Sequence, residues 1–123
     1  MKISCDVSAC VSTRATCDGD EWVISGAKTF TTNGVYGDLY FVAARTGDTG
    51  PRHRQLSQFL VERDAPGLTV GKGLEKTGMW ASDTAELVLE DVRVPSYSLI
   101  GEEGRGFYQL AEGLQRERLM AAV

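Results

Sequence analysis

The most constraining feature of the sequence is a series of short apolar runs, separated by Gly, Pro and Asp, that fills its first three quarters. Apolar and polar residues alternate over 11–17 and again over 85–94, which predicts strands with one buried face. The run 39–44 is apolar throughout and predicts a strand buried on both faces. Many short strands joined by tight turns predict an antiparallel β-barrel or β-sandwich.

Turn residues predict where the strands end. Asp18-Gly19-Asp20 between two β-like runs is the strongest hairpin signal in the chain. Ser25-Gly26 predicts another turn, which makes 27–32 a separate strand that Asn33-Gly34 closes. The polar residues 46–55 predict a loop. The rest of the β region predicts strands at 59–63 and 68–70 and an irregular segment at 71–82.

The last part of the sequence changes from strand periodicity to helix periodicity at about Gly106. Four apolar residues recur at the spacing i, i+3, i+4 and i+7, namely Phe107, Leu110, Ala111 and Leu114. Continued along the helix, this stripe places Arg118 near its centre and Glu117 at its edge. Charges on an apolar face are costly unless they are paired or used, so the pair is a candidate functional site. The alternative is a frayed, solvated last turn.

Composition excludes several classes of function. The chain has 123 residues and a net charge of −4, which suits one small domain and argues against nucleic acid as a partner. It holds no apolar run near the roughly 20 residues of a membrane span. An odd count of three cysteines favours a reducing, cytoplasmic compartment. With His53 as the single histidine, we expect neither a zinc site nor a self-contained Ser/His hydrolase.

Several strings, taken in order, resemble the acyl-CoA dehydrogenase family. The resemblance rests on 18–30, 31–34, 59–63, 66–67, 82–87, 91–95, 101–104, 106–107 and 117–119. It implies that residues 1–103 form the family's middle antiparallel β-barrel. Residues 104–123 then form the start of its C-terminal helical domain. Since neither end of the sequence falls at a natural domain edge, we expect a fragment of a longer protein.

The family's activity and cofactor follow from the same resemblance. It implies a flavoprotein that binds FAD and removes hydrogen from the α and β carbons of an acyl-CoA thioester. A carboxylate takes the α-proton, and the β-hydrogen leaves as hydride. An electron-transferring flavoprotein accepts the electrons, and the enzyme is a homo-oligomer. A same-fold oxidase or monooxygenase is the alternative enzyme, and a non-catalytic barrel or gene remnant is the alternative outside enzymes.

The resemblance also implies a flavin contact at Phe30, Thr31 and Thr32, just before Asn33-Gly34. An aromatic face can pack against the flavin ring, and a hydroxyl can donate a hydrogen bond to it. Without the resemblance, the same residues indicate an ordinary strand end before a turn. A second flavin stretch is expected upstream, where Ser4-Cys5-Asp6 replaces the family's Gly-Ser-Asp.

Glu117 is the candidate catalytic base by resemblance, because some branches of the family place the base at the Glu of a Glu-Arg pair on this helix. Other branches use a base farther downstream, beyond this sequence. Arg118 is expected to order the floor of the active site. Asp83 is expected to line the approach of acyl-CoA and to orient its loop, or simply to begin a strand.

Lys72, Lys76 and Arg105 are candidates for contacts with CoA phosphates, although cations at loop edges are usually only solvated. Because the family builds its flavin site from two domains and a neighbouring subunit, the isolated chain is expected to bind FAD weakly and to show little activity. The helix from Gly106 is expected to be under-buried.

Overall fold

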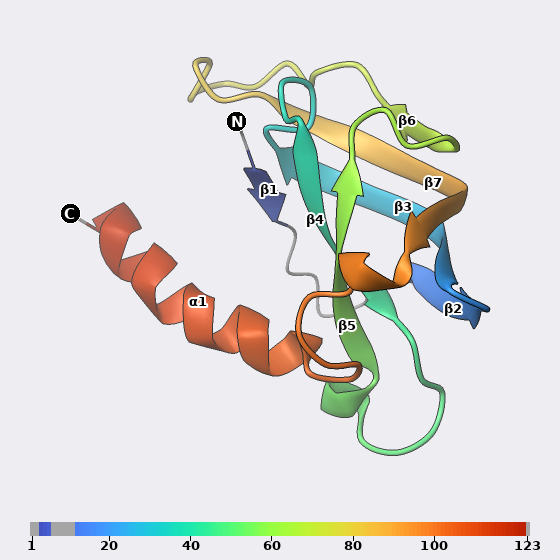
Figure 1. The fold of residues 1–123 in the computed structure, drawn as a ribbon. Helices are drawn as coiled ribbons and strands as arrows, with labels where there is room; N and C mark the ends of the chain where they lie inside the picture. Colours follow the sequence, from blue (N-terminus) through green and yellow to red (C-terminus); the bar gives the residue numbers. More distant parts are fainter. Residues whose placement is uncertain (1–2, 6–11, 123) are drawn as a thin grey trace.

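A computed structural model of the chain describes residues 3–5 and 12–122. It is mainly β, with one long helix at the C-terminal end (Figure 1). The strands are β1 (Ile3–Cys5), β2 (Arg14–Asp18), β3 (Glu21–Thr32), β4 (Leu39–Arg45), β5 (Leu56–Glu62), β6 (Leu68–Val70) and β7 (Thr84–Pro95). The helical elements are η1 (Arg52–Arg54), η2 (Ser96–Ser98) and α1 (Gly106–Ala122).

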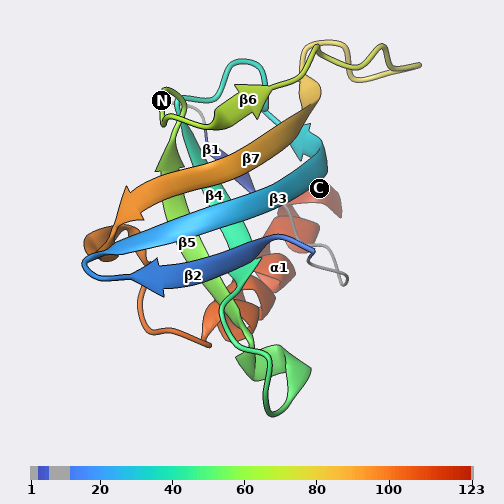
Figure 2. The same cartoon turned by 90° about the vertical axis from the view of Figure 1, so that its right-hand side faces the viewer.

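The strands follow the order β1-β4-β2-β3-β7-β6, with β5 on the other edge of β4. β1 and β2 both run parallel to β4, and β2 meets β4 only where Arg14 pairs with Arg45. All other pairings are antiparallel. Figure 2 shows β2, β3 and β7 crossing in front of β4 and β5, so the molecule has two layers. Among the described residues the sheet does not close on itself, so the predicted barrel is an open one.

The core lies between these two layers. Ile24 and Phe59 are fully buried, and the Trp22 and Phe59 ring centroids lie 5.2 Å apart. The other large core side chains come from β4, β5 and β7: Tyr40, Val42, Val61, Leu87, Leu89 and Val92. Burying an apolar side chain of this size stabilises the fold by about 2 kcal/mol. This shared core holds the two layers together.

Most predicted elements are present. Asp18 pairs with Glu21 across the Gly19-Asp20 turn, so the predicted hairpin is confirmed. β4 buries Tyr40, Val42, Ala43 and Ala44, in agreement with a strand covered on both faces. The predicted polar loop 46–55 is partly wrong, because it contains η1 and buries Gln55, whose side-chain amide donates to the Gly50 carbonyl.

The predicted turn at Ser25-Gly26 is wrong. β3 continues through it, and the pairing with β7 shifts register between Ile24 and Gly26. Gly26 has a φ of 147°, and a Cβ there would lie 2.6 Å from Thr13 Cα. The glycine therefore allows a bulge and a close backbone contact rather than a turn.

The predicted helix is confirmed as α1, and among the described residues it packs on the sheet mainly at its start. Gly106 is its one buried residue, and a Cβ there would lie 2.9 Å from the Leu56 carbonyl oxygen of β5. The stripe residue Phe107 is exposed. The helix is therefore under-buried, as expected. No helix in the described part of the chain is long and apolar enough to cross a membrane. The domain boundary at 103–104 stays a prediction.

Gly26→Ala should destabilise the fold by about 2–3 kcal/mol, because the new Cβ meets Thr13 in a backbone conformation that only glycine adopts readily. Gly78→Ala is the matched control, since nothing lies within 4 Å of a Cβ at that position. Urea denaturation measures both variants. Equal midpoints for the two would show that the contact at Gly26 is unimportant.

Candidate functional site

The candidate site is built on the last residues of β3. The ladder with β7 shifts register between Lys28 and Thr31, and Phe30 adopts a φ of 56° at this irregularity. The Phe30 side chain is 75% exposed, and Thr32 is exposed beyond it. The strand end therefore presents an aromatic ring and a hydroxyl to the outside, which is the pair that a flavin contact needs.

Thr31 lies between these two exposed residues and is buried, at 3% exposure. Its hydroxyl oxygen has no hydrogen-bond partner in the described part of the structure. A buried hydroxyl without a partner costs free energy, so the Thr31 hydroxyl lowers the stability of the strand end. The structure does not place the Thr31 hydroxyl where it can contact a ligand on the exposed side.

The turn that follows, residues 33–37, is tightly packed. Asn33 has a φ of 57°, and the Gly37 amide donates to the Asn33 carbonyl at 2.7 Å. Gly34 is buried against β7, where a Cβ would lie 2.8 Å from the Ala85 Cβ. A side chain at Gly34 is therefore excluded by packing.

Asp83 lies against this turn. Its carboxylate accepts a hydrogen bond from the Val35 amide at 2.6 Å, and its carbonyl accepts one from the Asn33 amide at 3.1 Å. The prediction that Asp83 orients its loop through backbone hydrogen bonds is correct in kind, but the bonded segment is 48 residues away in sequence. The predicted contact with acyl-CoA is untested.

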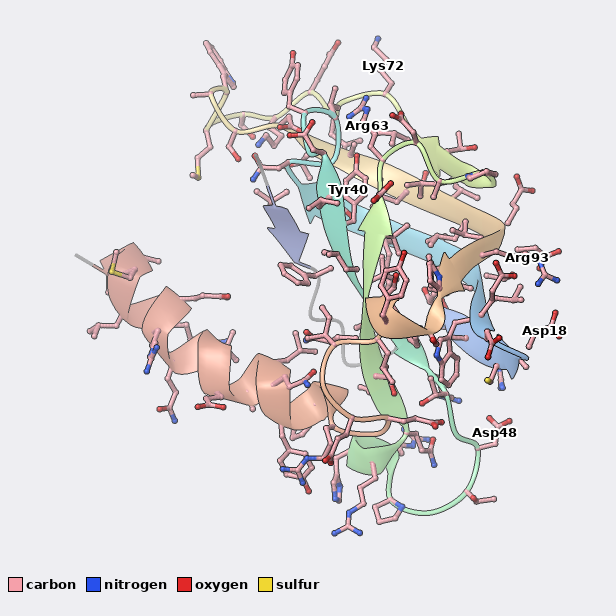
Figure 3. All side chains as sticks on the ribbon, in the orientation of Figure 1. Asp18, Tyr40, Asp48, Arg63, Lys72 and Arg93 are labelled. Atoms are coloured by element: carbon pink, nitrogen blue, oxygen red, sulfur yellow. The ribbon has the colours of Figure 1, made fainter. Side chains whose placement is uncertain are left out.

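Tyr40 and Arg63 bond to the same turn, and Figure 3 shows them next to each other. The Tyr40 hydroxyl donates to the Gly34 carbonyl at 2.8 Å, and the Arg63 guanidinium donates to the carbonyls of Val35 and Gly37. Burial raises the pKa of Tyr40, and the nearby Arg63 charge opposes this only in part. The phenol therefore stays protonated as a donor at neutral pH.

A shallow open groove of about 460 Å³ lies beside the turn. It is lined by Val35, Tyr36, 72–76, Trp80 and 82–84. The Lys76 ammonium is already hydrogen-bonded within the groove, because it donates to the Ser82 carbonyl and to the Thr84 hydroxyl. Lys72 is exposed at the groove (Figure 3). Of the two lysines considered for phosphate contacts, only Lys72 is without a described hydrogen bond.

Comparison with known proteins identifies the class of protein that carries this site. The family model for the acyl-CoA dehydrogenase middle domain matches residues 2–92. The chain belongs to the acyl-CoA dehydrogenase family. It is 47% identical over 114 residues to the long-chain specific acyl-CoA dehydrogenase of Rattus norvegicus, which covers 91% of this chain and 26% of the relative.

Two further relatives of this family support the assignment. A cyclohexane-1-carbonyl-CoA dehydrogenase of Geobacter metallireducens is 50% identical over 97 residues, covering 79% of this chain and 25% of the relative. The crystal structure of an acyl-CoA dehydrogenase from Geobacillus kaustophilus superposes with a TM-score of 0.85 at 54% identity, covering 89% of this chain and 29% of that one. The chain spans about a quarter of the length of the curated relatives it matches.

The remaining residues suggested by the family resemblance lie elsewhere. Glu117 and Arg118 are exposed on the outer part of α1, whose most extensive contacts are with β5 and η1. Within the described part of the chain, α1 makes no comparably extensive contact with β3. Arg105 lies over the Tyr108 ring at 4.7 Å from its centroid, and the exposed His53 ring lies edge-on to the same ring. The Asp6 position lies outside the described residues, and of Ser4 and Cys5 only the backbone is described.

The sequence reading missed Tyr40 and Arg63. Tyr40 lies in an apolar run that predicted only a buried strand, and Arg63 ends the next predicted strand. Their contact joins positions 23 residues apart. The one available signal was a tyrosine in a strand buried on both faces, since a buried phenol needs a hydrogen-bond partner.

Thr31→Val should raise the free energy of unfolding by about 1–2 kcal/mol, because it replaces a buried, unpartnered hydroxyl with a methyl group of similar shape. Thr29→Val on the exposed part of the same strand is the control and should change stability little. Chemical denaturation of both variants measures the difference. A loss of stability in Thr31→Val would show that the hydroxyl is satisfied.

The Tyr40 hydroxyl should make stability depend on pH in the alkaline range. Its pKa is raised above the ordinary 10.0 in the folded state, so the unfolded chain loses this proton first as the pH rises. The stability that the protonated Tyr40 hydroxyl contributes is therefore complete below about pH 10. Above that pH, the free energy of unfolding should fall by about 1.4 kcal/mol per pH unit until the folded-state pKa is reached. Tyr40→Phe should lack this component. Denaturation curves at pH 9 and pH 11 test it, and an identical pH dependence in both proteins would refute the assignment.

Proposed function

We propose that this chain supplies the β-domain wall of the flavin site in an FAD-dependent acyl-CoA dehydrogenase. The observation that carries the proposal is that Phe30 and Thr32 are both exposed at the end of one strand, in a domain of this family. The neighbouring turn is held by three polar side chains, so this wall is pre-organised.

The described residues fit a flavin. Phe30 offers an aromatic face, and Thr32 offers a hydroxyl donor for the polar edge of the ring. When bound, FAD supplies the acceptor for the hydride that leaves the β-carbon of an acyl-CoA thioester. The protein's part is to hold the ring against β3 and to keep the reacting atoms in place.

Glu117 is proposed as the carboxylate that takes the α-proton, with Arg118 ordering the groups around it. A carboxylate works as a base on a weakly acidic carbon only in a water-poor cleft, where its proton affinity rises. Glu117 is exposed here, so the role requires further protein surface over α1. The alternative within the family, a base farther downstream, requires no such change at Glu117.

The partners follow from the same proposal. Acyl-CoA is the substrate, an electron-transferring flavoprotein is the electron acceptor, and the enzyme is a homo-oligomer. Asp83 stays a proposed element of the acyl-CoA approach and lies at the groove beside the turn. A cytoplasmic location is inferred from the cysteine count alone, whereas the rat relative is named as mitochondrial.

Titration of FAD into the chain should give weak but saturable quenching of flavin fluorescence. Phe30→Ala should raise the dissociation constant about fivefold, the expected effect of losing an aromatic contact. Thr32→Val should raise it by a similar factor, because one hydrogen bond is lost. Turnover of acyl-CoA by the isolated chain is expected to be negligible.

The matched controls use residues of the same type away from this strand end. Tyr97→Ala removes another exposed aromatic ring, and Thr69→Val alters an exposed hydroxyl on β6. Neither control should change FAD binding. If quenching does not saturate, or if the controls weaken it as much as Phe30→Ala does, the proposed flavin wall is wrong.

A further inference from the structure

We propose that Asp83 is a positioning residue for the flavin wall: its carboxylate fixes the turn 33–37 and thereby holds Phe30 and Thr32 in their exposed orientation. The inference rests on the proposed function. It makes the backbone of turn 33–37 the partner of Asp83, whereas the sequence predicted bonds within the residue's own loop together with a contact with acyl-CoA.

The first step is the bonding of Asp83 itself. Its side chain accepts from the Val35 amide at 2.6 Å, and its carbonyl accepts from the Asn33 amide at 3.1 Å. A hydrogen bond from an amide to a carboxylate is short and about twice as strong as a neutral one. Thr31 pairs with Ala85 and Thr32 with Thr84, so the bond to Asn33 continues the β3–β7 ladder into the turn.

The second step is the backbone that this bonding constrains. Phe30 and Asn33 both adopt positive φ, at 56° and 57°, although neither is glycine. Such conformations are unfavourable for residues other than glycine, more so for Phe than for Asn, and persist where surrounding contacts enforce them. Thr31 adds a buried hydroxyl without a partner. The segment that presents Phe30 and Thr32 is therefore unfavourable by itself and needs an external restraint.

The third step is that the restraint acts on both the amides and the carbonyls of the turn. Asp83 accepts from the amides of Asn33 and Val35, whereas Tyr40 and Arg63 donate to carbonyls of the same turn. The amides and the carbonyls are thus satisfied by separate groups. A small rotation of the turn would disturb bonds of both kinds at once.

The fourth step is that Asp83 is itself held in place. The Lys76 ammonium bonds to the Ser82 carbonyl and to the Thr84 hydroxyl, the residues on either side of Asp83. The Leu74 amide donates to the Thr84 carbonyl at 2.8 Å. A carboxylate fixed in this way can transmit its position to the turn, which a mobile loop residue cannot do.

The test compares Asp83→Ala and Asp83→Asn with Asp48→Asn, which removes an exposed carboxylate on the distant 46–55 loop (Figure 3). In the chain without FAD, hydrogen exchange of the Val35 amide should accelerate about tenfold in Asp83→Ala, the expected effect of losing a bond to a charged group. Asp83→Asn keeps a neutral acceptor and should accelerate it less. NMR signals of Phe30 and Thr32 should shift in both variants, whereas those of Trp22 should not.

With FAD, the same order should hold for the dissociation constant, which should rise about tenfold in Asp83→Ala and less in Asp83→Asn. The absorption bands of the bound flavin should also shift, a change that a general loss of stability would not produce. If Asp83→Ala does not fold, Asp83→Asn alone decides the result.

The outcomes separate this inference from the proposed function. Unchanged Phe30 and Thr32 signals in folded Asp83 variants, or equal effects in Asp48→Asn, overturn the positioning role even if the chain binds FAD. Accelerated Val35 exchange with shifted Phe30 signals supports it. Absence of FAD binding by the unsubstituted chain overturns the proposed function, and the exchange data then still show whether Asp83 holds the turn.

Discussion

The pairing of β3 with β7 is the constraint on which the rest of the structure depends. The two strands run antiparallel from Glu21 opposite Pro95 to Thr32 opposite Thr84, and their inward residues fill much of the core. One end of this ladder continues into the Asp18–Glu21 hairpin. The other end carries Phe30 and Thr32, with Asp83 one residue beyond the last pair. Because both ends belong to one ladder, the burial of Ile24 and Leu87 that stabilises the fold also fixes where the candidate site lies.

The ladder would present ordinary side chains if it were regular. Two irregularities change this. At Gly26, the register shift lets β3 approach Thr13 closely, and the strand stays continuous over 12 residues. Between Lys28 and Thr31, the second shift turns the backbone of Phe30 into positive φ. Bulges near functional residues commonly redirect one side chain in this way. The candidate site is therefore formed by the two irregularities of the β3–β7 ladder. The hydrogen bonds of the polar groups around the turn compensate for the free energy that these irregularities cost.

Local sequence signals predicted the elements whose formation depends on neighbouring residues. The Asp-Gly hairpin, the apolar strand 39–44 and the helix from Gly106 each follow from a few adjacent residues. The Ser25-Gly26 turn failed because pairing with β7, more than 60 residues later, overrides a local turn preference. The burial of Thr31 and the contacts among Asp83, Tyr40 and Arg63 depend on strand register, which no local pattern encodes. The flavin stretch itself was found only through the family resemblance, since 30–32 alone reads as a strand end.

The proposed active site has two parts in this chain, the flavin wall and Glu117, and they differ in how firmly the surrounding structure holds them. The proposed flavin wall adjoins a turn that is held by hydrogen bonds within the β region. Among the described residues, Glu117 has no comparable support, because α1 packs mainly at its start, where Gly104 and Gly106 lie against η1 and β5. A general base must be desolvated before it can compete for an α-proton. In the proposed active site, the β region therefore positions the flavin, whereas the proposed chemistry at Glu117 depends on what packs over the outer turns of α1.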